Sequence, residues 1–247
     1  LDYSNTCILA NLKNQLTSED GFVLNDNDIK VTRAPSFTKD VKVVFDGVIV
    51  NSDDDKSLTF VSRGYEALQI EINRLNEDSI NHLITQTSGD FKNADFNNYY
   101  FNEDNISEKF FETIYLNKMH PAKSNYSSIN LKKYLKGKKG LFIVKANGYD
   151  PETKSKLGRT DRRLIMVTDI GIMVKTNLNS TKDLFISSLK SGVPISGAKV
   201  DVVGKNGIVI STKYTNRDGH ISFQSFDEYK NEKMPVAYIV NNSGDIS

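Results

Sequence analysis

The stretch from Leu164 to Val174, Leu-Ile-Met-Val-Thr-Asp-Ile-Gly-Ile-Met-Val, decides the fold. Two apolar runs of strand length flank Thr168-Asp169, and no Pro- or Ser-rich spacer separates them. We therefore expect one strand to end a domain here and the next strand to begin another. Because so short a connection allows little independent tumbling, Ile170 should be buried between the two domains. Gly171 should let the two backbones approach closely.

Turn signals follow this junction at short intervals. The Gly192 to Gly197 turn contains Pro194 and leads into an alternating apolar segment. Asn206-Gly207 suits a tight β-hairpin turn, in which both central residues have positive φ. The resulting strands are expected at 171–176, 183–189, 198–203, 208–215, 220–224 and 235–240. These are about six strands, where an immunoglobulin-like sandwich has seven.

The residues before the junction show the same strand periodicity. Strands are expected at Val41–Phe45, Val48–Val50, Leu58–Val61 and Ala67–Leu75. After Asn76 the period changes, since Ile80, Leu83 and Ile84 have the i, i+3, i+4 spacing of a short helix. Upstream of Pro35, residues 1–34 offer two or three short strands and no core of their own. The fold class is therefore all-β, with one partly helical insertion.

The insertion is rich in Asn, Asp and aromatic residues between positions 87 and 111. We expect Phe96, Tyr99 and Phe101 to pack at least partly on their own domain, because exposed aromatic surface is unfavourable in water. The alternative is an aromatic platform that binds a sugar or a protein partner.

Composition excludes several classes of protein. The 247 residues carry a formal net charge of +1, so no global field favours nucleic acid. Cys7 is the sole cysteine, which rules out an intrachain disulfide and is compatible with a reducing cytosol or a periplasm. No apolar run approaches the roughly 20 residues of a membrane helix. The chain begins at Leu1 without a signal peptide, and we interpret it as a segment of a longer protein.

Several motifs recur in an order and spacing that indicate one family. They are Asp161-Arg162-Arg163-Leu164, Thr168-Asp169-Ile170-Gly171, Gly192-x-Pro194-x-x-Gly197-Ala198 and Thr215-Asn216-x-Asp218-Gly219-x-x-x-Phe223. Further motifs upstream are Pro35-Ser36-Phe37, Phe45-x-Gly47, Leu68 to Leu75, Asn130 to Leu135 and Gly140 to Val144. Together they resemble bacterial alpha-2-macroglobulins over most of residues 35–245, most weakly between Thr85 and Glu112.

This resemblance implies tandem macroglobulin-like sandwiches of the immunoglobulin/fibronectin type with antiparallel sheets. Residues 1–34 would be tail strands of a preceding β-domain. Residues 35–169 would form one sandwich with an insertion near 76–118, and residues 170–247 a second sandwich.

The resemblance also implies a function. The chain would be an architectural part of a broad-range protease-trapping inhibitor that protects the bacterial cell envelope. Its partners would be neighbouring domains of the same long chain and, through the full-length protein, target proteases. The parent would be periplasmic, with a lipoprotein-type inner-membrane anchor outside this segment, and no nucleic acid would be bound. The alternative function is a cell-surface adhesin or carbohydrate-binding β-sandwich module.

The chemistry of a covalent trap is missing from the segment. Family members that react covalently use Cys-x-x-Gln for a thioester, whereas Cys7 is followed by Ile8, Leu9 and Ala10. We expect Cys7 to be a buried or half-buried structural thiol.

Other candidate catalytic and binding residues lack the spacing that their chemistry needs. His82, His120 and His220 do not form a metal motif, and His220 is expected to be exposed. Two Ser-x-x-Lys matches, Ser36 with Lys39 and Ser187 with Lys190, lack the partner motifs of acyltransferases. Asp53-Asp54-Asp55 lacks calcium-loop spacing and is expected to be a solvated hairpin tip. We predict no catalytic, cofactor-binding or metal site and no enzymatic activity.

The densest charge comprises Lys132, Lys133, Lys136, Lys138 and Lys139. Such a run can bind phosphates or an anionic membrane surface. The neighbouring leucines and glycines favour a solvated turn.

Overall fold

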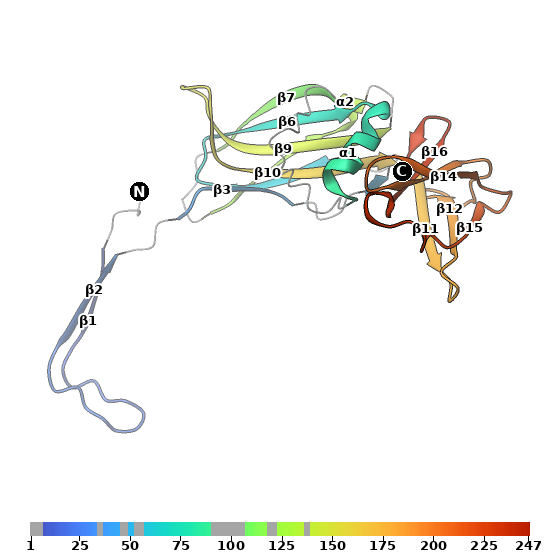
Figure 1. Ribbon diagram of the computed structural model, residues 1–247. Coiled ribbons are helices and arrows are strands. Elements are labelled where there is room, and N and C mark those ends of the chain that lie inside the picture. The colour runs from blue at the N-terminus through green and yellow to red at the C-terminus, as the bar shows by residue number, and fades with distance from the viewer. Residues whose placement is uncertain are drawn as a thin grey trace.

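The structure, a computed structural model, describes residues 7–33, 37–44, 49–51, 57–89, 107–117, 123–135 and 139–247. Three parts follow one another along the chain: an N-terminal hairpin, a larger sandwich and a smaller sandwich (Figure 1). The all-β prediction is confirmed. None of the helices within the described ranges has the length and apolar character to cross a membrane.

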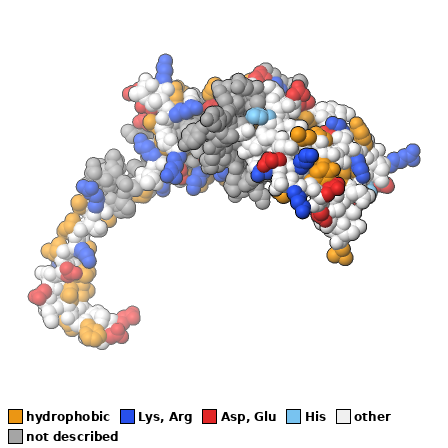
Figure 2. Space-filling model, in the orientation of Figure 1, with side chains coloured by type: hydrophobic (Ala, Val, Ile, Leu, Met, Phe, Trp, Pro, Cys, Tyr) orange, Lys and Arg blue, Asp and Glu red, His pale blue; other side chains and the backbone are white. Residues whose placement is uncertain are grey.

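The N-terminal hairpin pairs β1 (Cys7–Leu12) with β2 (Asp28–Arg33). Every residue of both strands is exposed, including the apolar cross-strand pair Leu9 and Val31. Figure 1 shows the hairpin projecting away from the rest of the chain, and Figure 2 shows hydrophobic side chains along it. The expectation of a buried or half-buried thiol is therefore wrong, because Cys7 is exposed on this strand.

The larger sandwich packs two sheets, with strand orders β4-β10-β9-β6-β7 and β3-β5-β8. The first sheet comprises β4 (Ile49–Asn51), β6 (Ala67–Leu75), β7 (Ser107–Tyr115), β9 (Gly140–Asp150) and β10 (Ser155–Thr168). The second comprises β3 (Asp40–Val43), β5 (Ser57–Arg63) and β8 (Asn125–Asn130). The chain passes from β3 in one sheet to β4 in the other. Strand β4 runs parallel to β10, whereas the other strand pairs in the described part of this sandwich are antiparallel.

Alternation along the strands builds the core of this sandwich. The predicted face of β6, formed by Leu68, Ile70 and Ile72, is fully buried. It packs in one cluster with residues of the facing sheet such as Leu58 and Phe60. Each Å² of apolar surface that these side chains bury stabilises the fold by roughly 25 cal/mol.

A short helix covers the opposite face of the five-stranded sheet at one end. The 3-10 turn η1 (Glu77–Ser79) leads into α1 (Ile80–Thr87), where the sequence predicts a helix. Leu83 is fully buried in a second cluster with Leu75, Leu141, Ile143 and Leu164. A second helix, α2 (Lys132–Leu135), follows β8. These contacts place α1 at the end of the sheet that faces the smaller sandwich (Figure 1).

The smaller sandwich has sheets of order β11-β12-β15 and β14-β13-β16-β17. Its strands are β11 (Ile170–Thr176), β12 (Lys182–Ser188), β13 (Lys199–Gly204), β14 (Val209–Tyr214), β15 (His220–Phe223), β16 (Pro235–Asn242) and β17 (Asp245–Ile246). A further 3-10 turn, η3 (Asn231–Lys233), precedes β16. The predicted strands are present within two residues at each end, and β17 is the one that the sequence did not indicate. The core combines residues such as Leu184, Val200 and Phe223.

The Asn206-Gly207 turn differs from its prediction. Gly207 has φ +76, but Asn206 is not among the residues with positive φ. Instead, the Gly207 amide donates to the Gly204 carbonyl at 2.8 Å, and the Gly204 amide donates to the Ile208 carbonyl at 2.9 Å. The hairpin loop thus has three residues, 205–207, and ends on a left-handed glycine, whereas the prediction was a two-residue loop with both φ values positive.

Candidate functional site

The junction between the two sandwiches is short and densely hydrogen-bonded. Strand β10 ends at Thr168 and β11 begins at Ile170, so only Asp169 lies between them. The larger core cluster includes Val167, whereas Ile170 belongs to the smaller one. The domain limits at residues 34 and 169 remain predictions from the sequence.

Asp245 is the centre of this junction. Its Oδ2 atom accepts hydrogen bonds from Lys139 Nζ at 2.6 Å and from the Asp169 amide at 3.1 Å, and its Oδ1 atom accepts one from Thr168 Oγ1 at 2.8 Å. The carboxylate side chain is 11% exposed, so water screens these contacts only in part. Because Asp245 lies on β17, its carboxylate ties the last strand of the smaller sandwich to the last strand of the larger one.

Thr168 and Asp169 also form hydrogen bonds with residues other than Asp245. The buried Thr168 Oγ1 atom accepts a hydrogen bond from the Ile170 amide at 3.0 Å while donating to Asp245. The Asp169 carbonyl accepts from the Leu189 amide at 2.7 Å, and Asp169 Oδ1 accepts from the Lys190 amide at 2.9 Å. Asp169 is thereby fixed by the turn that follows β12, and Thr168 by Asp245 and the start of β11.

The structure corrects two expectations about this junction. Ile170 is buried, with 1% of its surface exposed, but it packs in the core of the smaller sandwich rather than between the two. The reason is that β11 starts at this residue and points its side chain inward. A Cβ atom on Gly171 would lie 2.8 Å from Leu189 Cδ2, so this glycine makes room for a side chain of its own domain.

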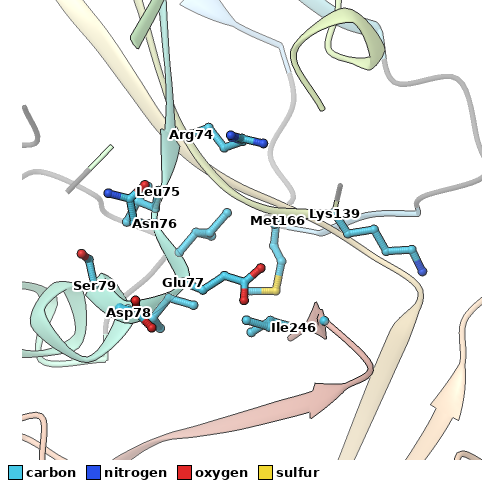
Figure 3. Close-up of a pocket in the computed structure, with 13 residues that line it drawn as sticks. Arg74, Leu75, Asn76, Glu77, Asp78, Ser79, Lys139, Met166 and Ile246 are labelled. Atoms are coloured by element: carbon cyan, nitrogen blue, oxygen red, sulfur yellow. The ribbon is translucent and has the colours of Figure 1, made fainter. Parts of the chain in front are cut away.

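A cavity of about 540 Å³ opens between the two sandwiches. Figure 3 shows its labelled side chains, which come from the end of β6 with η1 (Arg74 to Ser79), from the residue before β9 (Lys139), from β10 (Met166) and from β17 (Ile246). A neighbouring hollow of about 580 Å³ shares Glu77, Lys139 and Gly244 with it. Charges of both signs line these walls, and nothing in the described ranges groups three His, Cys, Asp or Glu side chains as metal ligands.

The candidates from the sequence are not brought together. His220 is half-buried rather than exposed, because β15 pairs with β12 and places its ring 4.8 Å from that of Phe185. Its Nε2 atom lies 3.0 Å from Asp183 Oδ1. Ser187 lies on β12 and Lys190 beyond the end of that strand. His82 lies on α1, far along the chain from both.

Other predictions fall outside the described residues. These are the predictions for Ser36, Asp53, Asp54, Asp55, Phe96, Tyr99, Phe101 and His120.

Two lysines of the basic run, Lys133 and Lys139, form ion pairs within the chain. Lys133 Nζ lies 2.6 Å from Glu112 Oε2, and Glu112 also accepts a hydrogen bond from the Tyr134 hydroxyl. Lys139 pairs with Asp245. Lys136 and Lys138 lie outside the described residues. The two described pairs hold α2 and the start of β9 in place.

A buried carboxylate that the sequence analysis did not single out, Glu71, lies on the face of β6 opposite to Leu68, Ile70 and Ile72. Glu71 is 6% exposed and contacts Lys145 and Lys156 at 3.1 and 3.0 Å and Lys109 at 3.8 Å. Burial by itself raises the pKa of Glu71, but hydrogen bonds and charge from Lys156 and Lys145 outweigh it and lower the pKa to about 2. Glu71 lines neither cavity, so this cluster stabilises the sheet.

Comparison with known proteins identifies relatives of this chain by sequence. Residues 167–247 match the sequence model of the bacterial alpha-2-macroglobulin MG3 domain. The alpha-2-macroglobulin of Rickettsia conorii is 32% identical over 254 residues, which cover 99% of this chain and 13% of the relative. The alpha-2-macroglobulin homolog of Yersinia pestis is 28% identical over 256 residues, covering 97% of this chain and 13% of the relative. The chain thus spans a small part of the length of these relatives.

Solved structures agree in fold. Native alpha-2-macroglobulin from Escherichia coli spanning domains MG0-NIE-MG1 superposes with a TM-score of 0.70 at 12% identity, covering 98% of this chain and 73% of that chain. The shorter form spanning NIE-MG1 has a TM-score of 0.67 at 16% identity, covering 86% of this chain and 97% of that one. At these identities the likeness is one of fold.

Proposed function

Because this chain belongs to the bacterial alpha-2-macroglobulin family, we propose that its two sandwiches act as one rigid structural unit in the wall of a protease-trapping inhibitor. The observation that carries the proposal is the junction, where a single residue separates β10 from β11 and Asp245 accepts three hydrogen bonds across it. A junction of this kind supplies stiffness, not chemistry.

The segment itself would contribute no catalysis and no covalent capture. Its partners would be neighbouring domains of the same long chain, and target proteases would be met through the complete inhibitor. The exposed apolar hairpin supports this arrangement, because a two-stranded hairpin is marginally stable in water unless another layer covers it. We further propose, from the family alone, a periplasmic location and a lipoprotein-type anchor outside this segment.

The test uses the full-length inhibitor that carries this segment. Trapping is measured as protection of a bound protease from a large protein inhibitor while it still cleaves a small substrate. Replacing Asp245 with Ala should reduce the trapped fraction several-fold, whereas Asp218→Ala, in an exposed turn of the same sandwich, should not. Equal trapping by the Asp245 variant and the parent would refute the structural role proposed for the junction.

A second candidate function, carbohydrate binding, is favoured by two exposed rings on the edge strand β7. Phe111 is 59% exposed and Tyr115 is 73% exposed, and they share one face of the strand. Exposed aromatic rings offer large apolar faces, and the Tyr hydroxyl can hydrogen-bond, which suits a ligand with both apolar and polar groups such as a sugar. Binding of the 247-residue chain to a glycan array, abolished by Tyr115→Ala, would support this function over the architectural one.

A further inference from the structure

Two glycines bring the smaller sandwich into contact with helix α1 of the larger one. A Cβ atom on Gly207 would lie 2.8 Å from the Asn81 carbonyl oxygen and 2.7 Å from Thr85 Cγ2. A Cβ atom on Gly89 would lie 2.5 Å from the Val236 carbonyl oxygen. Real Cβ atoms do not approach backbone this closely, so both contacts require glycine. One glycine lies on each side of the interface.

The helix is suited to this contact because it has two occupied faces. Leu83, which is 0% exposed, packs on the five-stranded sheet, and the neighbouring Ile84 is 1% exposed. Asn81 and Thr85 are four residues apart, which places them on a common face one turn apart. That second face meets the 204–207 turn between β13 and β14. Figure 1 shows α1 at the end of the larger sandwich that adjoins the smaller one.

We propose that α1 sets the angle between the two sandwiches, because the Gly207 turn docks on its Asn81/Thr85 face. The helix contacts are separate from the Asp245 contacts, so the junction is held at two places. With β10 and β11 joined by one residue, a single contact would leave rotation about the connection. The Gly207 and Gly89 contacts, which lie away from that connection, remove the rotation. This inference concerns the geometry of the segment and does not depend on protease trapping.

The chain offers matched controls for the glycines. Gly192 has φ +71, close to the +76 of Gly207, and Gly21 has φ +83, close to the +81 of Gly89. A Cβ atom at either control position would meet nothing within 4 Å. Alanine therefore brings similar backbone strain at all four positions but a collision only at Gly207 and Gly89.

The experiment measures the distance between spin labels on the two sandwiches. Labels are attached through Glu152→Cys and Leu178→Cys in a Cys7→Ser background, since both positions are exposed and lie on different sandwiches. Double electron–electron resonance should give the same narrow distance distribution for the parent, Gly192→Ala and Gly21→Ala. Gly207→Ala and Gly89→Ala should shift or broaden it. Distributions that match the controls would overturn the proposal.

A second measurement needs no substitution. In the unmutated protein, a nuclear Overhauser effect is expected between the Gly207 α-hydrogens and the Thr85 methyl group. Its absence would overturn the proposal even if neither glycine variant folds. Folding of each variant is checked by the dispersion of its amide signals.

Discussion

Lys139 and Asp245 form an ion pair with 2.6 Å between Nζ and Oδ2, although 106 positions separate them in the sequence. The lysine precedes β9 of the larger sandwich, and the aspartate begins the final strand of the smaller one. Their contact therefore joins the two sandwiches. This contact should couple the unfolding of the two sandwiches, and the coupling free energy can be measured.

Asp245→Ala should weaken that coupling by about 2 kcal/mol, because three donors lose their acceptor in a partly buried place. Lys139→Met should cost less, about 0.5–1 kcal/mol, since the lysine side chain is 35% exposed and only one bond is lost. Chemical denaturation checks both. The parent should unfold in one transition and the Asp245 variant in two, whereas a single unshifted transition in that variant would contradict the coupling.

Glu71→Gln should lower the free energy of unfolding by about 2–3 kcal/mol at pH 7, because three lysines lose a buried counter-charge. The folded pKa of about 2 lies below the unfolded value near 4.5, so the stabilisation is fully present above pH 4.5. It is lost as the pH falls toward 2, where the two proteins should converge. Exposed Glu152→Gln serves as the control and should change stability by less than about 0.5 kcal/mol. A difference between the Glu71 variant and the parent that is constant with pH would exclude this explanation.

Ile170→Asp should unfold the smaller sandwich and leave the larger one intact. A charge at a position that is 1% exposed in an apolar cluster lacks any partner, and even Ile170→Ala should cost about 2–4 kcal/mol. Amide signals of residues 171–247 should collapse in the Asp variant, while those of β5, β6 and β9 keep their dispersion. Preserved signals from both halves would show that Ile170 lies between the sandwiches after all.

The isolated chain should neither inhibit a protease stoichiometrically nor form covalent complexes with one. Cys7 has no Gln three residues later, so it cannot form an internal thioester. Incubation with trypsin followed by a denaturing gel checks this, with the full-length inhibitor as a positive control. A protease-sized mobility shift that resists boiling would contradict the expectation.

Local patterns in the sequence predicted most of the strands and α1, because alternation and i, i+3, i+4 spacing directly express which face is buried. The inward face of β6 and the buried Leu83 of α1 follow from that spacing. Strand β17 was missed because two residues carry no period. The destination of Ile170 was missed for a different reason, since periodicity shows that a side chain is buried but not in which core.

The contacts that fix the junction left no signal in the sequence. Asp245 meets partners 76, 77 and 106 positions away, and a single aspartate after a glycine resembles any solvated turn. Gly207 was assigned to hairpin geometry, yet its packing on α1 is the additional reason that a side chain does not fit there. The sequence likewise did not predict the ion pairs of Glu71, because the three lysines that contact it come from three other strands.

The parallel pairing of β4 with β10 has a consequence for synthesis. Ile49 pairs with Met166, so the five-stranded sheet stays incomplete until the ribosome has made more than a hundred further residues. At 5–20 residues per second this takes on the order of ten seconds, during which the early strands have no completed sheet to join. The smaller sandwich pairs only within residues 170–246 and closes over a shorter span. Nascent chains of the larger sandwich are therefore exposed to aggregation for the longer time, and chaperone capture is most useful before Thr168 emerges.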